Sequence, residues 1–522
     1  MRRRRLVRAL STSTVVLSAL LAGCSPLLAA DPRYATDSGA HPQGQPTTKN
    51  KADGPPPIQA PKNDLAWRNC TSQVFSDSGL PALPGVTLDC ASYDADLDPI
   101  SGANGTVSIG VVRARSVQTP DDAGPLVMTT GSDLPTSVQL PVWLSRAGAD
   151  VLKNHPIVAI DRRGMGMSSP IDCRDAFDRQ EMLDQAQFES GDDPVANLRA
   201  ITMTATTSCT DTIAPGDSAY DNLHAAEDIE RLRSTWDVPA IALLGIGNGA
   251  QVALAYASSH PDKVARLVLD SPLALGIADE AATEQRVKGE QTALDAFASQ
   301  CAANNCPLGP DPKGAVDALL ADARAGNGPG GASVATVADA ISTALAYPRG
   351  DRTAATNSLA SAVASARGGD PNEMNNLINQ ADTLRQTDGQ FVNSCSDALN
   401  RPTPDRVREL VVAWAKQYPQ FGDVGALSMV KCLNWPSGTV PGEPENLKIP
   451  VLLLGVQNDP IVGNEGVAQV AATVINAGAS SKRVIWQGIG HGASIYSECA
   501  LGPVFSYLDS GELPPTDTYC PA

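Results

Sequence analysis

The sequence predicts an α/β fold: a mostly parallel, doubly wound sheet that carries a large helical insertion. Short, continuous apolar runs are typical of strands that are buried on both faces. Such runs occur at residues 107–112, 126–128, 157–160, 240–244, 267–269, 451–454 and 484–486. Between 240 and 269, a strand, a glycine-rich turn, a helix at 250–258 and a second strand form a βαβ unit, which favours parallel pairing.

The insertion is predicted at 276–447, where the strand-like runs stop. This stretch is rich in Ala, Asp, Asn and Gln and has helical periodicity at 292–302, 316–325 and 406–417. The sheet resumes with the apolar run that follows residue 448. We therefore expect a helical lid inserted between two parts of one sheet domain.

The charge of the chain excludes one class of partner. The 522 residues include 39 Lys and Arg against 57 Asp and Glu, which gives a formal net charge of −18. A surface this acidic repels phosphate backbones, so nucleic acid is not an expected partner. Because only 4% of the residues are aromatic, the core must be built mainly from Ala, Val, Leu and Ile.

The N-terminus has the pattern of an export signal. Arginines at positions 2–5 and 8 precede an apolar stretch at 15–22, which is too short to span a bilayer. The stretch ends in Leu21-Ala22-Gly23-Cys24, which resembles the lipobox of bacterial lipoproteins. The resemblance implies that Cys24 is acylated and holds the exported chain at the outer face of the cell membrane. An ordinary secretory signal with an incidental Cys is the alternative.

The residues after Cys24 are rich in Pro, Gly, Lys, Asp and Thr and lack periodicity, as in a flexible tether. The expected organisation is therefore a signal peptide at 1–23, a lipidated tether at 24–66, a first core part at 67–275, the lid at 276–447 and a C-terminal core part at 448–522.

The cysteines indicate disulfides. Apart from Cys24, an even number of the 11 Cys remains, which suits an oxidising compartment. Sequence alone leaves the connectivity open, but pairing sequential neighbours closes five short loops and is our expectation: Cys70–Cys90, Cys173–Cys209, Cys301–Cys306, Cys395–Cys432 and Cys499–Cys520. Metal binding is the alternative, yet no C-x-x-C occurs and the five His are scattered. We expect neither a metal nor a cofactor.

The turn of the βαβ unit reads Gly-Ile-Gly-Asn-Gly at 245–249. Its position and glycine spacing match the nucleophile elbow G-x-S-x-G, in which a strained turn exposes a central serine. The central residue here is Gly247, which has no side chain, and no complete G-x-S-x-G occurs in the chain. The next residue, Asn248, is a poor nucleophile whose side chain should point away from the site.

Two further residues follow in the chain order of an α/β-hydrolase triad. Asp459 comes after the apolar run at 451–454, and His491 lies in a glycine-rich loop after the run at 484–486. In such a triad the carboxylate orients the imidazole, which takes a proton from the nucleophile. Asp459 and His491 are therefore the candidate acid and base. The alternative is a buried hydrogen-bonded pair that holds two loops together.

The chain resembles the exported, tripeptidyl aminopeptidase-like (TAP-like) branch of the α/β-hydrolases. The resemblance rests on Trp-Arg-Asn-Cys at 67–70, Ile-Asp-Arg-Arg-Gly at 160–164, Ser-Gln-Cys at 299–301, Cys-Pro-Leu-Gly at 306–309, Asn-Asp-Pro at 458–460, His491 and the spacing of the cysteines. It implies an α/β-hydrolase core with a helical lid and an ancestry among serine peptidases or esterases. It also supports the sequential disulfides.

Two departures from the family pattern bear on activity. Family members have Ser where this chain has Gly247, and their oxyanion loop is similar to N-P-G-G-P-G, where this chain has Thr-Thr-Gly-Ser-Asp-Leu at 129–134. Only Gly131 of that loop is the same here. By the resemblance, the oxyanion hole would be formed by the backbone N–H groups of Gly131 and Asn248. An oxyanion hole needs N–H groups aimed at a developing negative charge. Asp133 instead places a carboxylate near that point.

These departures lead to two main hypotheses. The first is a non-catalytic binding or scaffold protein of the cell envelope that holds a peptide, acyl or glycolipid ligand uncleaved beneath the lid. The second is an active hydrolase of peptide or ester substrates, in which His491 and Asp459 activate water. Loss of a triad serine costs on the order of 10^6 in turnover, so covalent catalysis of the family's kind is not expected. A purely structural role in the envelope is a third alternative.

Overall fold

The computed structural model describes residues 54–146, 148–185 and 191–522. Cys24, the expected signal peptide and most of the expected tether lie outside this part of the chain. No helix within the described ranges combines the length and the apolar character needed to cross a membrane.

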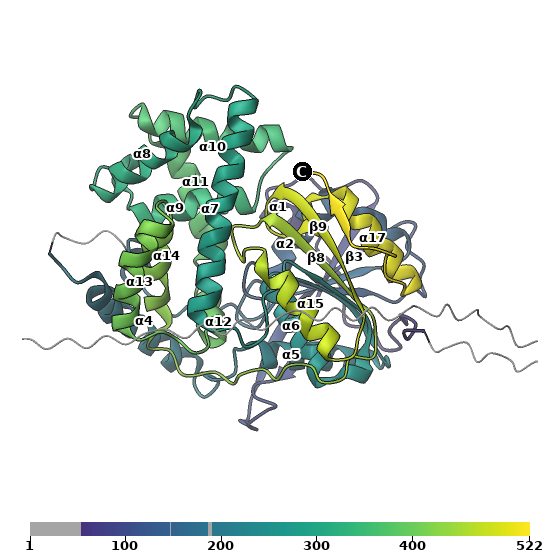
Figure 1. Cartoon of the computed structure of the whole chain (residues 1–522). Helices are drawn as coiled ribbons and strands as arrows, with labels where there is room; N and C mark the ends of the chain where they lie inside the picture. The colour runs from purple at the N-terminus through teal and green to yellow at the C-terminus, as the bar shows by residue number, and fades with distance from the viewer. Residues whose placement is uncertain (1–53, 147, 186–190) are drawn as a thin grey trace, which may run out of the picture. The chain divides into compact units, whose positions relative to one another are not determined.

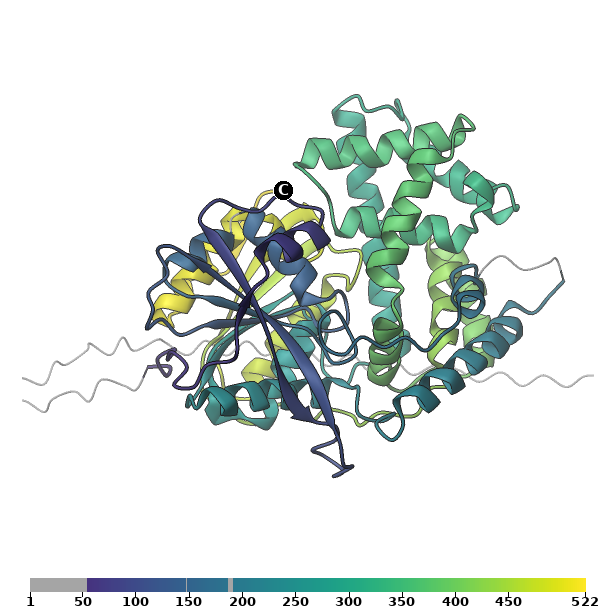
Figure 2. The same cartoon turned by 180° about the vertical axis from the view of Figure 1, so that it is seen from behind.

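A ten-stranded sheet forms the core, in the order β1-β2-β3-β5-β4-β6-β7-β8-β9-β10 (Figures 1 and 2). The strands are β1 (Arg68–Asn69), β2 (Val86–Asp96), β3 (Thr106–Ser116), β4 (Leu126–Thr129), β5 (Ile157–Ile160), β6 (Ile241–Ile246), β7 (Val264–Asp270), β8 (Val451–Asn458), β9 (Ser481–Ile489) and β10 (Thr518–Cys520). The pairs β1–β2, β2–β3 and β3–β5 are antiparallel. All pairs from β5 through β4 and β6 to β10 are parallel. The predicted apolar runs fall on β3 to β9.

Helices cover both faces of this sheet, as Figure 1 shows. One face packs on α5 (Asn222–Trp236), α6 (Asn248–Ser259) and α15 (Glu465–Asn476), and the other on α1 (Thr71–Asp77), α2 (Thr136–Ser145) and α17 (Glu498–Ser510). Adjacent residues of β6 point to opposite faces: Leu243 packs in the apolar cluster with α5, α6 and α15, and Leu244 in the cluster with α1, α2 and α17. The predicted doubly wound α/β fold is confirmed. Short helices complete the core: η1 (Gly148–Lys153), η2 (Pro261–Lys263) and α16 (Ala493–Tyr496).

The neighbouring strands β4 and β6 form the switch point of the sheet. β4 continues into α2 on one face, and β6 continues into α6 on the other. The loops that leave the carboxyl ends of two such strands diverge, and open α/β sheets bind their ligands in the crevice between them. The loop at 130–135 and the turn at Gly247 therefore lie side by side.

The lid joins β7 to β8. It contains α7 (Asp279–Ala303), α8 (Pro312–Arg324), η3 (Pro329–Gly331), α9 (Val334–Ala346), α10 (Arg352–Arg367), α11 (Asn372–Arg385), α12 (Asp388–Asp397), α13 (Pro404–Gln417), α14 (Gly422–Ser428) and η4 (Met429–Cys432). Before the expected insertion, α3 (Ala176–Leu183) leads to α4 (Pro194–Ile213). Val195 and Leu198 of α4 share one apolar cluster with the lid helices. The lid is thus built from two segments of the chain.

Part of the expected tether also belongs to the fold. The Lys62 N–H donates to the Trp236 carbonyl at 2.9 Å, and Arg266 donates to the Pro56 carbonyl at 2.9 Å. Gln59 forms a β-bridge with Ala123. The extended, proline-rich backbone is held here by contacts with distant residues, which its composition alone does not reveal.

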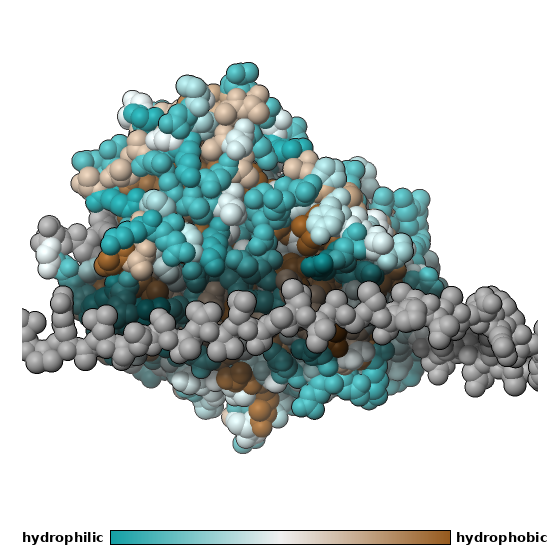
Figure 3. Space-filling model, in the orientation of Figure 1, coloured by the Kyte–Doolittle hydropathy of each residue, from teal (hydrophilic) through white to brown (hydrophobic). Residues whose placement is uncertain are grey.

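The disulfides join sequential cysteines: Cys70–Cys90, Cys173–Cys209, Cys301–Cys306, Cys395–Cys432 and Cys499–Cys520. The second and fourth of these lie in one small buried cluster with Phe391 and Trp435, where α4, α12 and η4 meet. The first of these two closes a loop within the segment that contains α4 and the second a loop within the lid, and the two pack against each other in this cluster. The face of the molecule in Figure 3 is mainly hydrophilic, in line with the acidic composition.

The turn between β6 and α6 generates the first prediction. A Cβ on Gly249 would fall on the Thr129 carbonyl of β4, so Gly249→Ala should lower the free energy of unfolding by about 1–3 kcal/mol. Urea unfolding followed by Trp fluorescence measures the change. The matched control is Gly502→Ala in α17, where a Cβ meets nothing within 4 Å. There the higher helix propensity of Ala should raise the free energy of unfolding by as much as about 1 kcal/mol. Equal effects of the two substitutions would contradict the close approach of β4 and α6.

Candidate functional site

The elbow residue Gly247 lies between β6 and α6 in a backbone conformation that favours glycine. Its φ is 59° and its ψ is −122°, a combination that strains residues with a side chain. The Gly247 N–H donates to the Asp270 carbonyl at the end of β7, at 2.9 Å. The turn keeps the geometry of a nucleophile elbow but has no side chain to expose.

Asp459 and His491 lie together beside this turn. His491 Nδ1 is 3.0 Å from each carboxylate oxygen of Asp459. Asp459 is fully buried and also accepts the Ile461 N–H at 2.9 Å. The His491 N–H donates to the carbonyl of Ala346, the last residue of α9, at 2.8 Å. The imidazole of His491 is therefore held by Asp459, and its backbone by the lid.

The carboxylate of Asp133 occupies the space next to His491. Its Oδ2 lies 3.3 Å from His491 Nε2 and accepts the Asn248 N–H at 2.6 Å. A Cβ on Gly247 would fall on this Oδ2 and on His491 Nε2. Asp133 thus fills the volume that a serine side chain at position 247 would need.

Each backbone N–H of the candidate oxyanion hole already has an acceptor. The Asn248 N–H donates to Asp133, the Ser132 N–H to Asn248 Oδ1 at 2.9 Å, and the Gly131 N–H to Thr129 Oγ1 at 3.2 Å. Gly131 has a φ of 58°, and a Cβ there would fall on Asn248 Oδ1. This explains why the loop keeps its glycine although its N–H groups are no longer available to an oxyanion.

The side chain of Asn248 points away from His491, into a polar network. Its Oδ1 accepts from Arg162 at 2.6 Å, and its Nδ2 donates to Gln251 at 3.1 Å and to Asp397 at 3.2 Å. Arg162 also pairs with Asp397 at 2.7 Å. Because Asp397 is the last residue of α12, this network ties the elbow to the lid.

His491 is held as an imidazolium. Burial of the ring opposes the charge, but Asp459 and Asp133 outweigh it and raise the pKa of His491 to about 10. At pH 7 the ring is then almost entirely in the charged form. A positive charge bound on both sides by carboxylates is the stable state of this site.

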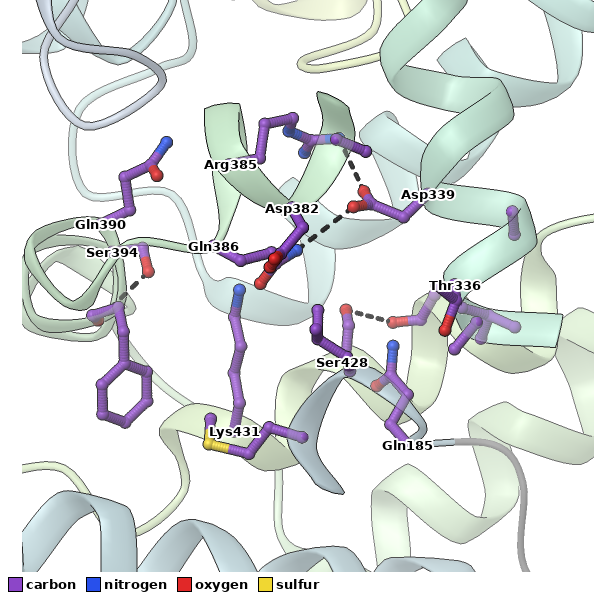
Figure 4. Close-up of a pocket in the computed structure, with 18 of the residues that line it drawn as sticks. Gln185, Thr336, Asp339, Asp382, Arg385, Gln386, Gln390, Ser394, Ser428 and Lys431 are labelled. Carbon is purple, nitrogen blue, oxygen red and sulfur yellow. Dashed lines mark hydrogen bonds and ion pairs between the residues drawn. The ribbon is translucent and has the colours of Figure 1, made fainter. Parts of the chain in front are cut away.

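A cavity of about 380 Å³ lies between the lid and the switch point. Ser132, Asp133 and Tyr347 belong to its lining, whereas His491 and Gly247, although described, do not. Polar and charged side chains dominate the wall shown in Figure 4. Asp133 therefore stands between this space and the imidazole.

Two features escaped the sequence analysis. The Thr-Thr-Gly-Ser-Asp-Leu loop suggested a carboxylate near the oxyanion position, but the contact of Asp133 with His491 depends on the path of the loop. The charged lining from the lid, which includes Arg385 and Lys431, has no motif that could have revealed it.

Comparisons with known proteins agree with this architecture. Residues 418–520 match the family described as TAP-like protein. The serine protease Hip1 of Mycobacterium tuberculosis is 24% identical over 257 residues, which cover 48% of each chain. The chain thus spans about half the length of the first curated relatives that it matches. Carboxylesterase B of Mycobacterium tuberculosis is 24% identical over 507 residues, covering 89% of this chain and 91% of that protein.

Solved structures show more distant likeness. A crystal structure of esterase E22 has a TM-score of 0.40 at 11% identity, and covers 81% of this chain and 99% of that one. For esterase RhEst1 from Rhodococcus sp. ECU1013, the TM-score is 0.36 at 17% identity, with the same two coverages.

The titration of His491 is the second prediction. Because the pKa of His491 is raised in the folded protein, its protonation stabilises the fold. This contribution is complete at pH values below the ordinary pKa of 6.5 and is lost as the pH rises through about 10. The Asp133→Asn variant should titrate at a lower pH, because one of the two carboxylates is gone. NMR of the ring resonances measures the pKa, and unfolding at several pH values measures the stability. The control is Asp322→Asn on the exposed side of α8, which should leave the titration of His491 unchanged. A wild-type pKa near 6.5 would contradict the arrangement.

Proposed function

We propose that this chain, an α/β-hydrolase with a TAP-like C-terminal region, binds a polar ligand beneath its lid without hydrolysing it. The observation that carries the proposal is the position of Asp133. Its carboxylate fills the space of the missing serine side chain and accepts the Asn248 N–H at 2.6 Å. A negative charge at this point opposes the charge that develops on a substrate carbonyl during acyl transfer.

Hydrolysis by activated water is the second candidate, and the geometry counts against it. A general base needs a neutral ring with a free lone pair within reach of water. His491 has a pKa of about 10, and its two nitrogens face Asp459 and Asp133. The ring does not line the cavity where a substrate would lie.

The composition of the cavity favours a polar ligand over an acyl chain. Within the described part of the chain, Asp279 Oδ2 and the Tyr347 hydroxyl are buried without a hydrogen-bond partner. Both residues line the cavity. Buried polar groups are normally satisfied, so the lining suits a ligand with hydrogen-bonding groups, such as a peptide or the sugar part of a glycolipid.

The proposed place of action is the cell envelope. The basic and apolar segments before Cys24 support export and lipid anchoring. The disulfides of the described chain support an oxidising compartment. Mass spectrometry of the N-terminal peptide from membrane fractions tests the anchor: an unmodified Cys24 in the mature chain would refute it.

The third prediction separates loss of the nucleophile from loss of the site. Wild type should not react with a fluorophosphonate probe, and neither should Gly247→Ser, because the new side chain meets the Asp133 carboxylate. The double variant Gly247→Ser/Asp133→Ala removes that carboxylate and frees the Asn248 N–H. It should be labelled and should hydrolyse activated esters at least about 10^2-fold faster than wild type, since one oxyanion-hole donor alone is worth about 10^2–10^3.

Adding His491→Ala to the double variant is the control and should abolish the gain. Turnover by wild type that depends on His491 would contradict the proposal and favour the hydrolase. Labelling of Gly247→Ser alone would show that Asp133 does not block the elbow.

A further inference from the structure

Four cationic side chains line the cavity: Arg174, Arg286, Arg385 and Lys431. The arginines are each paired with a carboxylate, from Asp388 at 2.8 Å, Glu290 at 2.8 Å and Asp339 at 2.9 Å respectively. Lys431 differs, because no hydrogen bond or ion pair joins its ammonium to any described residue. In Figure 4 it extends from η4 into the hollow, and no dashed line reaches it.

An unpaired ammonium in such a place is unfavourable. Burial, and then the charges of Arg286 and Arg385, lower the pKa of Lys431 to about 8. Asp339 and Asp279 act in the opposite direction but do not offset this effect. Lys431 is therefore still mostly charged at pH 7, and its charge faces a space that a ligand can enter. Fully buried charges are normally paired, whereas the partly buried Lys431 leaves its ammonium open to a partner that enters the cavity.

The neighbouring acidic groups do not supply the missing partner. Asp339 is already bound to Arg385 and to Gln386. Asp279 and Asp382 also line the cavity, but among the described residues no hydrogen bond or ion pair joins either carboxylate to Lys431. Room for another group therefore remains next to the ammonium.

We propose that Lys431 forms a subsite for an anionic group, a carboxylate or a phosphate, of the ligand held beneath the lid. The subsite rests on the proposed binding function of the cavity. A lysine ammonium is a compact charge with three donors, which binds a carboxylate or a phosphate oxygen without demanding a planar partner. Arg286 and Arg385 on the lid helices α7 and α11 are already paired with Glu290 and Asp339, so the ammonium of Lys431 is the group left for the anion.

Two anionic probes and one pair of variants test the subsite. Inorganic phosphate and acetate are titrated into the purified protein at constant ionic strength set with sodium chloride, with the rise in Tm as the readout. At least one of the two should stabilise wild type. In Lys431→Met the affinity for that probe should fall by about tenfold or more, which is the usual loss for a charge-assisted hydrogen bond. Lys416→Met, on the exposed side of α13, should bind as wild type does.

Acylation of the amine gives a second readout that does not depend on the variants folding. With a limiting amount of an acetylating reagent at pH 8, the Lys431 peptide should be modified, and the bound probe should protect it several-fold more than it protects Lys416. A response to phosphate alone identifies a phosphate-bearing ligand, and a response to acetate a carboxylate.

The outcomes keep the two proposals apart. Equal binding by wild type and Lys431→Met, or acetylation of Lys431 that neither probe reduces, would overturn the anionic subsite even if the chain is catalytically inert. Ester turnover by wild type that depends on His491 would overturn the proposed function, even where the probes protect Lys431.

Discussion

The Asp133 carboxylate binds the Asn248 N–H and faces the His491 ring with the same oxygen, and the remaining features of the site follow from this contact. The elbow residue must be glycine, because any side chain would meet that oxygen. The imidazole must be charged, because carboxylates lie on both of its nitrogens. The cavity must end at Asp133, since its carboxylate separates the ring from the space beneath the lid.

Residues next to this contact join the lid to the core. The Asn248 side chain, which points away from His491, contacts both Arg162 and Asp397 of α12. The His491 backbone binds the end of α9, so two lid helices contact the residues around the elbow. A binding site gains from this rigidity, because a preorganised cavity loses less entropy when a ligand enters.

Much of the fold could be predicted because local patterns determine it. Apolar runs mark β3 to β9, and the glycines at 245 and 249 mark a turn where strand and helix meet closely. β2 was not predicted, because its polar and apolar residues mix and no run is continuous. Asp133 could be placed near the oxyanion position, but its contact with His491 arises from the path of a loop. Lys431 lies in a short helix without a motif, so only the folded lid reveals where its charge points.

The missing serine and the rewritten oxyanion loop are best understood as one change rather than two. A serine at position 247 and an aspartate at position 133 exclude each other, because the Cβ of one falls on the carboxylate of the other. With glycine at 247 but no aspartate at 133, the Asn248 N–H would lack this acceptor and the charged ring would have one carboxylate fewer. With Asp133 present, the buried donor and the imidazolium are both satisfied, whereas removing one member of a buried charged pair is strongly destabilising. The elbow is therefore a stable charged cluster in its own right, and the ligand binding that we propose belongs to the cavity on the other side of Asp133.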